Sequence, residues 1–192
     1  MGNLESYFYN CSREYVDSVS PSLFDEIATA IAGSLKRATQ SQLNADLFWL
    51  LVSQGWSFDA KPAGTGDAPP QALGVSAALD EVRKGNVRDL CLTSTTLGAR
   101  WHADFAKILP GGLAQVEVQF SKTEAMFKDF CGFEIAYSER RLALGIEIVM
   151  LEPGRYFEQR KAAISGMARY SIARDTLSAI GLTCPIWLIG MQ

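Results

Sequence analysis

The stretch 101–120, WHADFAKILPGGLAQVEVQF, contains two apolar runs separated by the turn-forming residues Pro110-Gly111-Gly112. A proline and two glycines between such runs are typical of a β-hairpin, so we expect strands over 101–109 and 113–120. Because side chains alternate between the two faces of a strand, the second run divides into an apolar set and a polar set. The apolar set is Val116, Val118 and Phe120, and the polar set is Gln115, Glu117 and Gln119.

The segments on either side of this hairpin carry helix-like and strand-like apolar patterns. Helices are expected over 20–35, 44–54, 74–84, 122–132 and 156–180, the last interrupted near Gly166. A short strand is expected over 56–60, and the nearly continuous apolar runs 143–151 and 185–191 are typical of interior strands. This order of elements predicts an α/β fold, a central mixed β-sheet flanked by helices.

Length and composition are those of one compact globular domain. The chain has 192 residues, of which 48% are hydrophobic and 20% charged, and its formal net charge is -3. We therefore expect a single domain over 1–192, with an N-terminal helical part over about 1–55 and a catalytic sheet part over about 56–192. The slightly acidic charge argues against a generally adhesive nucleic-acid binder but leaves room for a local basic cleft.

The cysteines and the hydropathy pattern bear on metal sites and on location. Cys11, Cys91, Cys131 and Cys184 form no CxxC pair and His102 is the only histidine, so a structural zinc site is not expected. Charged residues occur throughout the first thirty positions, and no eighteen apolar residues run together, so we expect no contact with a membrane. These features predict a cytoplasmic protein with reduced thiols.

Two acidic residues of the hairpin could share one cation. Asp104 precedes Glu117 by 13 positions, and Gln119 follows on the same face as Glu117. If the hairpin register brings them together, two carboxylates, the Gln119 carbonyl and the backbone carbonyl of Val118 converge, and Mg²⁺ suits such oxygen ligands. From the spacing alone, a simpler interpretation is favoured, namely two exposed acids on an edge hairpin.

Four separated segments favour the cation site over the two exposed acids. They are VEVQFSK at 116–122, LGIEIV at 144–149, ISGM at 164–167 and PIWLIG at 185–190. In this order and at these distances they resemble the BglII-type family of type II restriction endonucleases, over 101–191. That family is similar to the wider PD-(D/E)xK nucleases, with Gln in place of the usual Lys. The resemblance implies a restriction-endonuclease-like fold.

The resemblance also assigns roles to the hairpin residues. It implies that Asp104 and Glu117 are catalytic carboxylates that bind Mg²⁺ together with the Val118 carbonyl, and that Gln119 is the third catalytic residue. Ser121 replaces the family glycine, and the spacing between the first acid and the ExQ strand is longer than usual. The turn at 109–112 would have to absorb this difference.

Residues for contact with double-stranded DNA are expected directly after the catalytic strand, at a loop end, and in and near the segment that matches the family's serine-glycine segment. They are Ser121, Lys122, Thr123, Arg140, Arg141, Ser165 and Arg169.

The apolar helix at 126–133 corresponds to a segment that forms part of a dimer interface in the family, so we expect a homodimer on a palindromic site. The function implied is Mg²⁺-dependent cleavage of double-stranded DNA at a short palindrome, leaving 5′ phosphates. Two alternatives remain, a catalytically inactive DNA-binding or regulatory protein on the same fold and a structure-specific repair nuclease.

Three further polar residues have two interpretations each. His102 shares the face of Asp104, which makes it a candidate general base, although a hydrogen-bonded structural role is favoured. Glu147 lies in an apolar strand and needs a partner, either by supporting the metal site or by pairing with an Arg. Asp46 could add an acid to the cleft, but an exposed helix position is the commoner role of such a residue.

Overall fold

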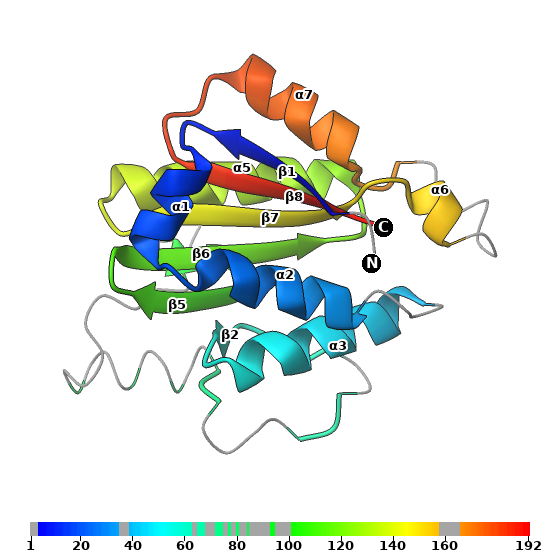
Figure 1. Cartoon of the computed structure of the whole chain (residues 1–192), viewed down its shortest axis with the longest axis horizontal. Helices are drawn as coiled ribbons and strands as arrows, with labels where there is room; N and C mark the ends of the chain where they lie inside the picture. Colours follow the sequence, from blue (N-terminus) through cyan, green and yellow to red (C-terminus); the bar gives the residue numbers. More distant parts are fainter. Residues whose placement is uncertain are drawn as a thin grey trace.

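A computed structural model of the chain describes residues 4–34, 39–62, 65–67, 72–74, 77, 80, 84, 93–94, 101–157 and 166–192. Its main sheet has six strands in the order β1-β8-β7-β6-β5-β2 (Figure 1). These are β1 (Leu4–Tyr9), β2 (Ser57–Phe58), β5 (Phe105–Leu109), β6 (Gly112–Gln119), β7 (Leu144–Met150) and β8 (Ile186–Met191). Strands β6, β7 and β8 are parallel, whereas β1, β5 and β2 pair antiparallel with their neighbours. The predicted central mixed β-sheet flanked by helices is confirmed.

The β5–β6 hairpin forms where the sequence predicts it, but its first strand is interrupted. Leu109 lies opposite Gly112, so the turn consists of Pro110 and Gly111. Upstream, β4 (Trp101–His102) leaves the main sheet and pairs with β3 (Thr93–Ser94) in a separate two-stranded sheet. The expected continuous strand over 101–109 is therefore wrong, and residues 103–104 lie at the break.

Helices cover the two faces of the sheet in two groups (Figure 1). One face packs against α1 (Arg13–Val19), α2 (Leu23–Ser34) and α3 (Gln40–Ser53), and the other against α5 (Thr123–Ser138) and α7 (Tyr170–Ile180). Helices α2 and α3 confirm the helices expected over 20–35 and 44–54. Helix α3 begins earlier than predicted because the Thr39 hydroxyl accepts a hydrogen bond from the Gln42 N–H. Helix α5 likewise continues beyond its expected end to Ser138.

The sequence did not predict strand β1, which places the N-terminal segment in the main sheet. β1 pairs antiparallel with β8, so that Leu4 lies opposite Met191. The Trp187 indole N–H of β8 donates a hydrogen bond of 3.0 Å to the hydroxyl of Ser6. The N-terminal part is therefore helical only after its first strand. The strand was not predicted because its partner lies far away in the sequence.

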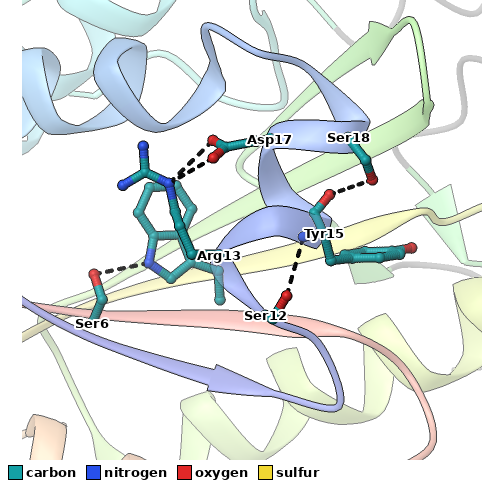
Figure 2. Close-up of polar contacts among 7 residues, drawn as sticks. Ser6, Ser12, Arg13, Tyr15, Asp17 and Ser18 are labelled. Carbon is teal, nitrogen blue, oxygen red and sulfur yellow. Dashed lines mark hydrogen bonds and ion pairs between the residues drawn. The ribbon is translucent and has the colours of Figure 1, made fainter.

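Helix α1 was also not predicted, and polar contacts hold it in place (Figure 2). The Ser12 hydroxyl caps it by accepting the Tyr15 N–H, and Arg13 forms an ion pair with Asp17 one turn later. The Arg13 guanidinium lies 3.4 Å from the centre of the Phe24 ring of α2. The first two contacts stabilise α1 itself, and the cation–π interaction with Phe24 holds α1 against α2.

The end of this first helical group also supports the hairpin turn. The Gly111 N–H donates a hydrogen bond of 2.8 Å to the Val19 carbonyl at the end of α1. A Cβ at Gly111 would lie 2.6 Å from the Val19 Cα, so only glycine permits this close approach. The turn glycine therefore serves tertiary packing as well as chain reversal.

The segment expected as a helix over 156–180 with an interruption near Gly166 is interrupted there, as predicted. The chain forms a short helix α6 (Pro153–Tyr156), and after residues outside the described ranges it is extended at Met167 and Arg169, which form single bridges with Lys122 and Met150. Only α7 corresponds to the second half of the prediction. Most of the expected helix over 74–84 lies outside the described residues. No helix in the described part of the chain is long and apolar enough to cross a membrane.

Candidate active site

The break between β4 and β5 brings the two predicted carboxylates together. Asp104 lies directly before β5, and its Oδ2 accepts a hydrogen bond of 2.9 Å from the Val118 N–H. In return, Oε2 of Glu117 accepts the Asp104 N–H at 3.4 Å. The longer spacing between Asp104 and the ExQ strand is absorbed by the five paired residues of β5 and the tight turn.

The interpretation of two exposed acids on an edge hairpin is wrong. Strand β6 lies in the interior of the sheet between β5 and β7, and its polar face is covered by α5. Glu117 is only 5% exposed, and Gln115 is fully buried. These polar side chains therefore lie within the protein, where each needs a hydrogen bond or a charge partner.

Two further acids join this pair, Glu147, for which support of the metal site was one of two interpretations, and Asp129, which was not predicted. Glu147 of β7 lies directly opposite Glu117 in the parallel register and is fully buried. Asp129 projects from α5 and is 7% exposed. We call Asp104, Glu117, Asp129 and Glu147 the acid cluster.

Parts of the acid cluster lack a hydrogen-bonding partner among the described residues. Oε1 of Glu117 and both carboxylate oxygens of Glu147 are buried without one. One of the two interpretations of Glu147, a pairing with an Arg, is not found among the described residues. A buried carboxylate without a partner is costly, so this arrangement requires protons or bound cations to balance its charge.

Burial and the neighbouring charges raise the pKa values of three members of the acid cluster, Asp104, Glu117 and Glu147. Burial raises the pKa of Asp104 to about 6, against the hydrogen bond from Val118, and the charges of Asp129 and Asp59 add to the effect. Burial, followed by the neighbouring carboxylates, raises the pKa of Glu117 well above its usual value. The pKa of Glu147 is raised for the same two reasons. A group of acids that resist ionisation is typical of a functional site.

A small cavity adjoins Asp104 on the side facing α3. Its volume is about 80 Å³, and its walls include Asn44 of α3, Phe105 of β5 and Val118 of β6. Oδ1 of Asn44 is buried without a hydrogen-bonding partner. The cavity thus offers oxygen atoms and has room for more than one water molecule.

The oxygen donors of this site fit a hard cation better than a soft one. Asp104 and Glu117 supply carboxylates, Val118 lies at the same cavity, and the oxygens without partners need a positive charge. Within the described residues, no three His, Cys, Asp or Glu side chains already form a metal-binding group. Mg²⁺ suits such a site because it retains waters and substrate oxygens in its shell.

Gln119 is fixed at the end of β6 by two neighbours. Its Nε2 donates a hydrogen bond of 3.1 Å to Oδ2 of Asp129, and its Oε1 accepts the Ser121 N–H at 3.1 Å. The Ser121 hydroxyl also donates to Oε1. The third predicted site residue therefore lies beside the acid cluster and is held by it.

The segment that follows β6 meets a second predicted DNA-facing segment. Lys122 and Met167 form an antiparallel bridge, and the Ala168 N–H donates to the Ser121 carbonyl at 2.9 Å. The Thr123 hydroxyl donates to the Gly166 carbonyl at 3.1 Å. Ser121 and Lys122 are exposed next to Gln119.

Arg169 belongs to the same neighbourhood. It precedes α7, and its Nε is buried without a hydrogen-bonding partner. Ser165 lies outside the described residues.

Arg140 and Arg141 do not lie near the site. They follow the C-terminal end of α5, and the chain next donates from the Ala143 N–H to the Leu113 carbonyl at the start of β6. Arg140 is exposed, and Arg141 forms an ion pair with Glu139. Because α5 returns the chain from the end of β6 to the start of the parallel strand β7, these arginines are at the end of the strands opposite to Gln119.

The two remaining polar candidates are His102 and Asp46. Nδ1 of His102 lies 3.1 Å from a carboxylate oxygen of Asp59, but it forms no hydrogen bond with a described residue, so both interpretations of His102 stay predictions. Asp46 lies on α3, but Asn44 and Leu47 of that helix line the cavity instead.

A family model supplies the decisive comparison. The model described as restriction endonuclease BglII/BglIII matches residues 4–191. The chain belongs to the BglII/BglIII family of restriction endonucleases. As a member of this family it is a type II site-specific deoxyribonuclease, and the match extends the resemblance of 101–191 to the N-terminal half.

Solved structures agree with this membership. The crystal structure of restriction endonuclease BglII complexed with a DNA 16-mer is similar, with a TM-score of 0.62 and 15% sequence identity over 98% of this chain and 76% of that chain. At this identity the similarity shows that the BglII/BglIII-family chain shares the fold. No curated protein sequence matches it.

Proposed function

We propose that this BglII/BglIII-family protein hydrolyses double-stranded DNA at a short palindrome in the presence of Mg²⁺ and leaves 5′ phosphates. The observation that carries the proposal is the convergence of Asp104 and Glu117 at one point beside a cavity. Buried carboxylate oxygens without a protein partner at the same point support a cation there.

Asp104 and Glu117 would hold the ion, with the Val118 carbonyl as a further ligand. When bound, Mg²⁺ would lower the pKa of a water molecule and neutralise charge on the phosphate. In the reaction the water oxygen bonds to phosphorus, the bond to the 3′ oxygen breaks, and that oxygen takes up a proton. Gln119 can orient the water by hydrogen bonding, but an amide cannot accept its proton near neutral pH, so the proton passes to solvent or to a phosphate oxygen.

The DNA would approach along the segment next to Gln119. Ser121, Lys122 and Thr123 lie there, with Arg169 on the adjoining segment, and their side chains suit phosphate and base-edge oxygens. Ser165 remains a predicted contact from sequence. Arg140 and Arg141 are too far along the sheet to join this surface of the same protomer.

A homodimer would match the symmetry of a palindromic target. The outer side of α5 supports it, since Phe127 is 42% exposed and Cys131 lies exposed one turn further on, while Met126 and Phe130 of the same helix face the core. The expected mass in solution is near twice 21.0 kDa. Phe127→Glu should shift the protein to monomers with unchanged circular dichroism, and a wild-type monomer bound to DNA would contradict the dimer.

The main test is incubation of the purified protein with plasmid and genomic DNA in Mg²⁺ or EDTA, followed by sequencing of fragment ends. We expect discrete fragments whose ends share one palindrome, and none in EDTA. Glu117→Ala should abolish cleavage but retain DNA binding, whereas Asp25→Ala, which removes an exposed acid of α2, should cleave normally. Binding without cleavage would favour the inactive DNA-binding alternative, and cleavage only at branched or damaged DNA would favour the repair nuclease.

A further inference from the structure

The orientation of the Gln119 side-chain amide is set by two partners of opposite chemistry. Asp129 presents a carboxylate oxygen, which accepts hydrogen bonds, to Nε2 at 3.1 Å. Ser121 presents a backbone N–H, which can only donate, to Oε1 at 3.1 Å. If the amide were reversed, Oε1 would face a carboxylate and Nε2 would face an N–H, and both contacts would be repulsive. The chemistry of the neighbours therefore permits one orientation.

Asp129 is placed for this contact by the packing of α5. It shares the buried side of that helix with Met126, Phe130 and Phe133 and is 7% exposed, so its side chain is directed at the sheet. An acid on the apolar side of a helix requires a compensating contact, and Gln119 provides one. A hydrogen bond to a carboxylate is also stronger than one between neutral groups.

We propose that Asp129 is a positioning residue for DNA cleavage, because it holds Nε2 of Gln119 and thereby presents Oε1 as a hydrogen-bond acceptor for the attacking water. This inference rests on the proposed function. A carbonyl oxygen has two lone pairs, and the Ser121 N–H uses one of them. The Ser121 hydroxyl can rotate away from the other, which is then available to the water. Gln119 thus acts as an acceptor and not as a donor.

The first test measures single-turnover cleavage in a double-mutant cycle. Asp129→Ala should slow cleavage by about 10- to 100-fold, as is usual for residues that orient an active-site side chain, with DNA affinity unchanged. In a Gln119→Ala background the same substitution should change the rate by less than about twofold, because its target is already absent. Lys128→Ala, the exposed neighbour on α5, is the matched control and should cleave like the wild type. Equal effects of Asp129→Ala in both backgrounds would overturn the proposal.

A second test reverses the polarity of the hydrogen bond. Gln119→Glu places two carboxylates against each other but keeps the acceptor for the Ser121 N–H. Adding Asp129→Asn restores a donor–acceptor pair, so it should raise the cleavage rate of Gln119→Glu by about tenfold or more. In the otherwise wild-type protein, Asp129→Asn should slow cleavage less than Asp129→Ala does, since an amide carbonyl can still accept a weaker hydrogen bond from Nε2. Absence of rescue in the double variant would contradict the assigned orientation.

A third measurement is independent of activity. In glutamine-labelled protein, the side-chain NH₂ signals of Gln119, assigned by their loss in Gln119→Ala, should shift in Asp129→Ala and stay unchanged in Lys128→Ala. Unfolding temperatures of all variants verify the fold. An unchanged NH₂ signal in Asp129→Ala would refute the contact. A wild-type protein that does not cleave DNA would refute the proposed function, whereas the NMR result would still decide whether Asp129 holds Gln119.

Discussion

Replacing Asp104 with Asn should stabilise the protein in the absence of metal, although the same change should abolish cleavage. Burial raises the pKa of Asp104 from 3.8 to about 6. Since one pKa unit corresponds to 1.36 kcal/mol, ionisation of this carboxyl in the folded state costs about 3 kcal/mol at pH 8. Asn is uncharged, and its carbonyl can still accept the Val118 N–H. The free energy of unfolding should therefore rise by about 3 kcal/mol, or the melting temperature by about 6 to 12 °C.

The stability gained by Asp104→Asn should depend on pH. A raised carboxyl pKa means that the folded state binds more protons between pH 3.8 and about 6, so the wild-type protein loses this stability as pH rises through that window. The advantage of Asp104→Asn should accordingly shrink to about 1 kcal/mol at pH 4.5. Urea unfolding in EDTA at fixed protein concentration measures both values, with Asp25→Asn as an exposed control. A variant that is no more stable at pH 8, or equally favoured at pH 4.5, would refute the electrostatic argument.

Three further changes test other parts of the structure. Glu147→Gln should raise the melting temperature in EDTA at pH 8, because it removes a buried charge without a partner; a lower melting temperature would contradict this. Gly111→Ala should destabilise the protein by about 1–3 kcal/mol in urea unfolding, since the new Cβ would collide with the Val19 backbone. Burial alone would raise the pKa of Glu134, but hydrogen bonds from Thr183 and the next residue hold it below its usual value. Glu134→Ala should therefore cost about 1–2 kcal/mol at pH 7 and less at pH 3, and a loss that is the same at both pH values would exclude the ionised form as the cause.

The sequence predicted the elements whose contacts are local or whose pattern is strong. The β5–β6 hairpin has a turn signal between alternating runs, and β7 and β8 are almost uninterrupted apolar segments. Strand β1 escaped prediction because it alternates weakly and gains its partner from β8, at the far end of the chain. The interruption expected near Gly166 in the helix over 156–180 is confirmed, since bridges to Lys122 and Met150 keep Met167 and Arg169 extended before α7 begins.

The candidate site was predicted in part. Asp104, Glu117 and Gln119 were found through the hairpin spacing and the family resemblance, and the structure brings them to one place. Asp129 was missed because it belongs to a helix, and helix spacing says nothing about which strand residue it meets. One signal was present, because Asp129 lies on the same helical side as the apolar residues of 126–133. An acid within an apolar stripe is a sign of a buried polar contact.

The pairing of β1 with β8 has a consequence for the synthesis of the chain. Strand β1 leaves the ribosome early but must wait for residues 186–191 before it acquires its hydrogen-bonding partner. Until then, one edge of β7 is unprotected, and contacts of such long sequence separation form slowly. Chains that lack β8 should therefore expose an unpaired, aggregation-prone edge of β7. Aggregation should fall sharply when β8 has paired with β1 and β7.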